Sequence, residues 1–125
     1  MNKTTLVLPL PPNMLNSRRN WRVQLRAKKA YWQRCDILRL ALPKPPATPP
    51  ERIRATATLY VWALMDDDNA MARIKWAADW IVAQGYVADD RKKNIEWAGL
   101  PHQVVDRKAQ RLEITIEPIA ESEAA

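Results

Sequence analysis

Four stretches of the chain have the residue pattern of β-strands. In residues 52–64, RIRATATLYVWAL, apolar side chains alternate with charged or small polar ones, which predicts a strand with one buried face. Residues 4–10, TTLVLPL, and residues 111–117, RLEITIE, are rich in β-branched and apolar residues and predict two more strands. The stretch 92–98 is the fourth predicted strand, and a turn near residues 99–101 follows it.

Two other stretches have the longer period of an amphipathic helix. Between residues 23 and 42 apolar side chains recur at helical spacing, and a cluster of prolines within residues 43–50 ends the pattern. Residues 69–84 form the second predicted helix, which Gly85 terminates and Asp68 or Asn69 caps. Its expected buried side carries Met71, Ile74, Ala78 and Ile81.

The order of these elements predicts an α+β domain. One mixed sheet of about four strands is expected to carry two main helices packed on it. At 125 residues the chain has the length of one domain, and we assign residues 1–120 to it and residues 121–125 to a frayed tail.

The composition excludes several classes of chemistry. Cys35 is the only cysteine and His102 the only histidine, which argues against a disulfide framework, a Cys-rich zinc site and a nucleophilic triad. Two glycines are too few for a phosphate-binding loop, so no nucleotide cofactor is expected. Since no apolar run is long enough to cross a bilayer and the beginning of the chain does not resemble a signal peptide, we expect no membrane association and a cytoplasmic location.

Positive charge is concentrated in the first third of the chain. The formal net charge is +6, and residues 1–35 hold eight Lys or Arg and no acidic residue. This pattern predicts DNA binding through phosphate contacts and a stacking ring. The candidate DNA-binding residues are Arg18, Arg19, Trp21, Arg22, Arg26, Lys28 and Lys29. The alternative is a solvated loop and helix face. The other five tryptophans fall in predicted helices or strands and are expected to be packing residues.

An acidic cluster follows the strand predicted at residues 52–64. Asp66, Asp67 and Asp68 are consecutive, and their mutual repulsion is costly unless a cation neutralises it. Oxygen ligands without nearby Cys or His favour Mg²⁺, with Mn²⁺ as a substitute. Lys75 is spaced to share a helix face with Asp68 and Asp79, where it could contact a phosphate. The alternative is that the acidic residues are only a helix cap with favourable dipole charges.

These motifs together resemble the RusA family of Holliday junction resolvases, Mg²⁺-dependent endonucleases of bacteria and their phages. The resemblance rests on the opening strand that runs into LPLPPNMLNSRR, the acidic motif DDDN at 66–69, and KWAADWIVAQGYVADD at 75–90. The strand at 111–117 also fits the family pattern. Nearly the whole chain is covered, except for the proline-rich residues 43–50.

The resemblance implies which residues are catalytic. The metal-binding aspartates would be Asp66, Asp68 and Asp90, and the essential lysine would be Lys75. Counted from Asp68, the family's lysine would fall on Ala72, whereas counted back from Asp79 and Asp90 it falls on Lys75. Arg73 is the substitute candidate for this role, although at five residues from Asp68 it points off the shared face.

The resemblance also implies a homodimer that binds branched DNA, a four-way junction, and cuts opposing strands in recombination and repair. The host would be a bacterium or a phage-infected cell. Two further interpretations stay open, a dimeric branched-DNA-binding module without cleavage and a scaffold protein whose acidic cluster is only a cap.

Overall fold

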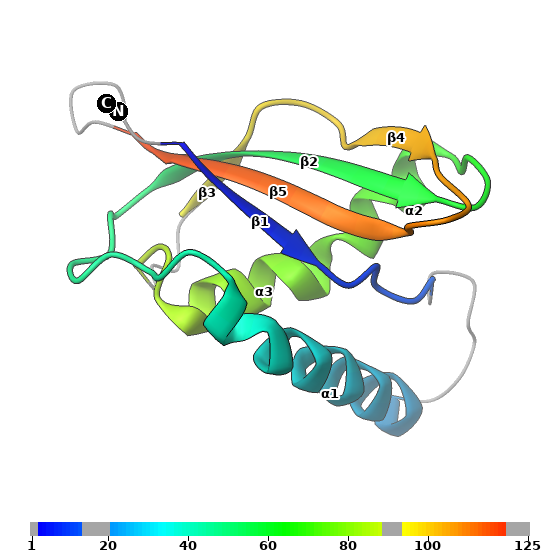
Figure 1. Cartoon of the computed structure of the whole chain (residues 1–125), viewed down its shortest axis with the longest axis horizontal. Coiled ribbons are helices and arrows are strands. Elements are labelled where there is room, and N and C mark those ends of the chain that lie inside the picture. The colour runs from blue at the N-terminus through cyan, green and yellow to red at the C-terminus, as the bar shows by residue number, and fades with distance from the viewer. Residues whose placement is uncertain (1–2, 14–20, 89–93, 120–125) are drawn as a thin grey trace.

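The computed structural model describes residues 3–13, 21–88 and 94–119. In chain order the elements are β1 (Thr4–Leu8), α1 (Trp21–Leu38), the 3-10 helix η1 (Arg39–Ala41), β2 (Ile53–Val61), α2 (Asp67–Arg73), α3 (Lys75–Gln84), β3 (Ile95–Trp97), β4 (His102–Val105) and β5 (Arg111–Pro118). The strands form one sheet, and the helices pack on one side of it (Figure 1). The predicted α+β domain with one mixed sheet is confirmed, with five strands instead of about four.

Strand β2 is the centre of the sheet. It pairs antiparallel with β5, and β5 pairs antiparallel with β1, which forms one edge. On its other side β2 pairs in parallel with two short strands in succession, β3 near its beginning and β4 near its end. Because β2 holds both sides together, its carboxyl end is a well-fixed point from which the chain enters α2.

The core lies between the sheet and the helices. Every second residue of β2 is buried, and β5 has the same alternation, as expected for strands with one covered face. Trp80 of α3 is completely buried, and its indole N–H donates to Asp36 Oδ1 of α1 at 2.9 Å. The partner for the indole N–H allows this large ring to be buried without leaving a polar group unsatisfied.

The second predicted helix is two helices in the structure. The chain is helical from Asp67 to Arg73 and again from Lys75 to Gln84, with Ile74 between them. The Ile74 carbonyl still accepts the Ala78 N–H at 3.0 Å, so the interruption is local. Gly85 ends α3 in the left-handed conformation, with φ of 92°, and confirms the predicted stop.

Three other details differ from the sequence predictions. Strand β4 was not expected, because only Gln103 among its four residues is even partly buried and the strand therefore has no alternating pattern. The residue that caps α2 is Asp66, two residues before Asp68 and three before Asn69, and its side chain makes no capping hydrogen bond. Trp62 was expected in the core, but it follows the end of β2 and is 57% exposed.

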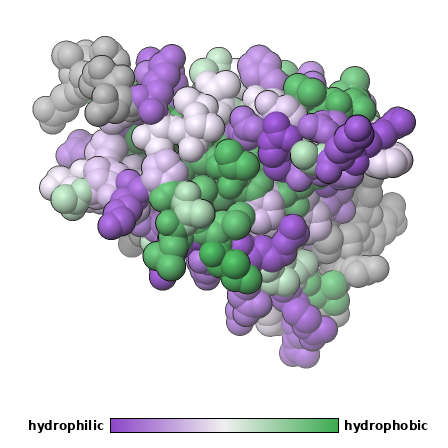
Figure 2. Space-filling model, in the orientation of Figure 1, coloured by the Kyte–Doolittle hydropathy of each residue, from purple (hydrophilic) through white to green (hydrophobic). Residues whose placement is uncertain are grey.

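Apolar side chains remain exposed on one face. Figure 2 shows hydrophobic residues gathered on the face that contains β1 and the end of α1 with η1. The exposed apolar residues of these elements are Val7, Ile37, Leu38 and Leu40, the last of them 93% exposed. Patches of this kind beside an edge strand are typical of protein interfaces. Among the described residues, no helix has the length and hydrophobicity needed to cross a membrane.

Candidate functional site

The acidic cluster lies at the junction between β2 and α2. After Val61 the chain runs through an irregular connection to Asp66, and α2 starts at Asp67. All three aspartates are exposed. Asp67 and Asp68 occupy the first helical turn, where unpaired backbone N–H groups and the helix dipole favour negative charge. The first turn therefore stabilises carboxylates that point into solvent and leaves their oxygen atoms accessible to a cation.

A side chain from β4 holds the backbone directly before this cluster. Gln103 Oε1 accepts the Met65 N–H at 2.9 Å, and Gln103 Nε2 donates to the Met65 carbonyl at 2.9 Å. One amide thus satisfies both backbone groups of the residue that precedes Asp66. Gln103 was not among the predicted site residues, since the strand that carries it has no recognisable pattern.

Lys75 is the first residue of α3 and is exposed. Within the described part of the chain it forms no ion pair. Its ammonium group is therefore accessible, in the helical segment that follows the acidic cluster. A group that binds an anion needs such access.

Asp79 contacts α1 and not Lys75. Its Oδ2 lies 3.1 Å from Lys28 Nζ, and the same ammonium group lies 5.2 Å from the centre of the Trp32 ring. The Trp32 indole N–H donates to the Trp76 carbonyl at 3.0 Å. Lys28, a candidate DNA-binding residue, thus helps to join α1 to α3, a contact worth about 1 kcal/mol or less for a partly exposed pair.

Other candidate DNA-binding residues meet at the beginning of α1. Trp21, Arg22, Arg26 and Lys29 line a shallow cleft of about 340 Å³ together with Leu25. The Arg22 guanidinium lies 5.4 Å from the Trp21 ring centre, and Trp21 is 67% exposed. Cations beside an exposed indole can contact phosphates and stack on a base. Arg18 and Arg19 lie outside the described residues.

The third expected metal ligand, Asp90, also lies outside the described residues. On one side of residues 89–93, the Ala88 N–H donates to the Pro50 carbonyl at 2.8 Å; on the other, the Asn94 carbonyl accepts the Ile53 N–H at 2.9 Å. Both flanks are held at the beginning of β2, whereas Asp66 follows its end. Eight residue steps along a strand cover about 26 Å. Within the described ranges, no three metal-ligating side chains form a cluster.

Comparison with known proteins adds no family assignment. The chain matches no protein-family model, and a search of curated proteins also finds no match. The resemblance to the RusA family therefore rests on the motifs themselves.

Proposed function

We propose that this protein is a Mg²⁺-dependent, structure-selective endodeoxyribonuclease that resolves four-way DNA junctions by paired, symmetric nicks. The observation that carries the proposal is the pair Asp66 and Asp68, exposed at the start of α2 and directly after the backbone that Gln103 holds. Carboxylates on well-positioned backbone suit a hard divalent cation. The basic cleft at the beginning of α1 supports a nucleic acid as the partner.

The described residues have separate tasks in this proposal. Asp66 and Asp68 would hold the cation through carboxylate oxygens, a donor set that suits Mg²⁺ or Mn²⁺. When bound, the ion supplies Lewis acidity toward a phosphodiester and lowers the pKa of a coordinated water. Lys75 would bind and orient the scissile phosphate, and Arg22, Arg26 and Lys29 would bind phosphates of the junction arms without reading sequence.

We also propose that the protein acts as a homodimer in which each site draws on both chains. The two flanks of residues 89–93 lie at the beginning of β2, and Asp66 follows its end, so the length of β2 lies between these flanks and Asp66. A two-fold axis can place the beginning of one β2 beside the end of the other. The third carboxylate would then be the partner subunit's Asp90. The exposed apolar face beside β1 supports an interface between copies.

The second candidate function is a dimeric module that binds branched DNA without cutting it. The position of Lys75 favours this alternative, because it lies seven residues after Asp68 and beyond the interruption at Ile74, whereas the family pattern places the lysine four residues after the second aspartate. Cleavage of a junction distinguishes the two functions directly.

The deciding experiment uses a labelled four-way junction and a linear duplex of matched sequence, each with Mg²⁺ and with EDTA. We expect paired symmetric nicks in the junction with Mg²⁺ only. Asp68→Asn should bind the junction as the unmodified protein does and should cut at least 100-fold more slowly, because it removes a metal ligand. Asp36→Asn, on α1 and away from the site, is the matched control. Tight binding without nicks under Mg²⁺ or Mn²⁺ would contradict the nuclease and favour the binding module.

A further inference from the structure

A second cleft lies away from the acidic cluster, where four segments of the chain meet. It has a volume of about 460 Å³ and is formed by the loop after β1, one face of α1, the end of α2 and the residue before β5. In Figure 1 the loop after β1 runs between the sheet and the first half of α1. The lining residues are Leu10, Pro11, Pro12, Ala27, Ala30, Tyr31, Arg34, Arg73 and Gln110.

Arg73 is anchored at one wall of this cleft. Its Nε–H donates to the Pro11 carbonyl at 2.6 Å, and burial lowers the pKa of the guanidinium. A guanidinium remains charged in proteins and has four more N–H donors on its two terminal nitrogens. Within the described chain those donors have no hydrogen-bond partner, so the anchored group can present them to a ligand.

A second cation lines the same cleft without a balancing acid. Arg34 comes from α1, and among the described residues neither Arg34 nor Arg73 forms an ion pair. No lining residue is acidic, and Gln110 adds a neutral amide. The half-buried guanidinium of Arg73 and the exposed one of Arg34 line one cleft and favour an anion there, and their planar donors suit the oxygens of a phosphate.

The cleft has room for more than a phosphate. Its volume falls in the range of about 300 to 1,000 Å³ that is typical of small-molecule sites. Leu10, Pro11 and Pro12 supply an apolar wall beside the two arginines, against which a base can pack. The combination of a cationic end and an apolar wall matches a nucleoside phosphate.

We propose that this cleft binds one unstacked nucleotide of a DNA strand, with its phosphate on Arg34 and Arg73 and its base against the proline wall. The proposal rests on the proposed nuclease function, since DNA is the source of the nucleotide. Arg73 ends the same helix whose first turn carries Asp67 and Asp68. Five residues of helix rise by about 7.5 Å, so a single strand can reach both the acidic cluster and the cleft.

The test measures binding by the full chain in EDTA, so that metal and cleavage play no part. The probes are tetrathymidylate without terminal phosphates, thymidine 5′-monophosphate and thymidine. We expect the tetranucleotide to bind most tightly, the monophosphate more weakly and thymidine not measurably, with amide chemical-shift changes at Ala27, Ala30 and Gln110. Arg34→Met and Arg73→Met should each weaken nucleotide binding roughly tenfold or more.

Arg39→Met on η1 is the matched control and should leave binding unchanged. Because Arg73→Met also removes the contact with Pro11, its fold is checked by circular dichroism, and the exposed Arg34 provides a test without that contact. Equal affinities for Arg34→Met and Arg39→Met would overturn the proposal, as would binding of thymidine as tight as that of the nucleotides. Tighter binding of the monophosphate than of the tetranucleotide would overturn the assignment to a DNA strand. If nucleotides bind to the cleft but the protein does not cleave the junction, the proposed nuclease function is refuted and the binding of a nucleotide in the cleft is not.

Discussion

Gln103 is the residue on which the geometry of the acidic cluster depends most directly. Its amide oxygen and nitrogen bond to the N–H and the carbonyl of Met65, each at 2.9 Å. A carboxylate could accept from the N–H but would have no donor for the carbonyl, and an apolar side chain would satisfy neither group. Gln103 thus acts on the cluster only through the backbone that precedes Asp66, as a positioning residue.

We expect Gln103→Leu to reduce both stability and metal use. Two part-buried backbone groups lose their partners, and the free energy of unfolding should fall by about 1 to 2 kcal/mol, measured by urea denaturation. The Mg²⁺ concentration for half-maximal nicking should also rise several-fold, since Asp66 is held less firmly. Gln33→Leu, at an exposed position of α1, is the control. An unchanged Mg²⁺ requirement in a destabilised Gln103→Leu protein would show that the residue is only structural.

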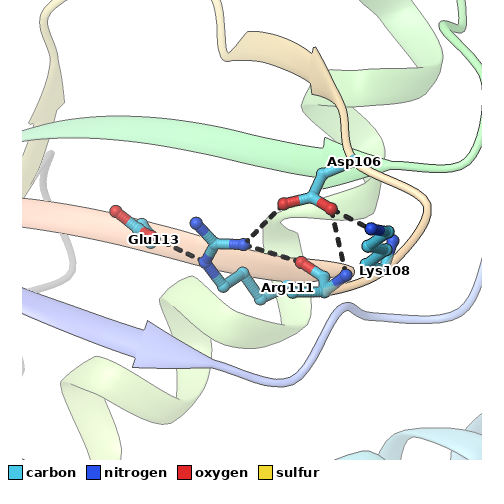
Figure 3. Close-up of polar contacts among 5 residues, drawn as sticks. Asp106, Lys108, Arg111 and Glu113 are labelled. Atoms are coloured by element: carbon cyan, nitrogen blue, oxygen red, sulfur yellow. Dashed lines mark hydrogen bonds and ion pairs between the residues drawn. The ribbon is translucent and has the colours of Figure 1, made fainter.

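The connection between β4 and β5 is organised by a small polar network (Figure 3). Asp106 Oδ1 accepts the N–H groups of Lys108 and Ala109 at 3.1 and 3.0 Å, and Oδ2 accepts from Arg111 at 3.2 Å. Arg111 also donates to Glu113 at 2.8 Å and lies 3.7 Å from the Tyr60 ring centre. The network joins the turn to both β5 and β2.

The network predicts a pH-dependent contribution to stability. The backbone N–H groups of Ala109 and Lys108, and then Arg111, lower the pKa of Asp106 in the folded protein, whereas in the unfolded chain it is about 3.9. Because the folded pKa is the lower one, the stabilisation is present above about pH 4 and is lost as the pH falls through the folded value. Asp106→Asn should therefore unfold at lower urea than the unmodified protein at pH 7.

This difference should shrink as the pH falls below about 4. Glu51→Gln, at an exposed site, provides the comparison and should show no such pH-dependent difference. A difference between Asp106→Asn and the unmodified protein that stayed constant from pH 7 to pH 2 would contradict a role of the charge.

At the scale of the whole molecule, β2 separates the first acidic motif from Ala88 and Asn94, the described residues on either side of 89–93. Asp66 and Asp68 follow the end of β2, and the flanks of residues 89–93 are held at its beginning. The helices α2 and α3 run back between these two ends, as Figure 1 shows. Under the proposed function, this separation leads us to expect a metal site that is shared between two copies of the chain.

Mixing two inactive variants tests this arrangement. Asp68→Asn and Asp90→Asn should each be inactive alone. A heterodimer of the two has one site in which unmodified Asp66 and Asp68 of one chain meet the partner subunit's Asp90, and we expect it to nick one strand of the junction. If each chain held its own site, both sites of the heterodimer would be damaged. Absence of nicking after mixing, with heterodimers confirmed by mass spectrometry, would contradict the shared site.

Much of the fold was predictable because its strands and helices have one buried face. The alternation in β2 and β5 and the helical spacing before Gly85 follow directly from which side chains are buried. Strand β4 was missed because it exposes most of its residues, and the break at Ile74 was missed because neither proline nor glycine marks it. In the candidate site, the three aspartates and the basic start of α1 were predictable from charge. The contacts that Gln103 and Arg73 make were not predicted.

By itself the sequence determined the class of the domain, the order of its main elements and the presence of one acidic and one basic region, since hydrophobic period and charge are local properties. Only the tertiary structure decided which groups meet. Gln103 reaches Met65 from a strand 38 residues away, and Arg73 reaches Pro11 across 62 residues. Such contacts depend on how the sheet is ordered and how the helices cross it, and no local pattern of residues records that arrangement.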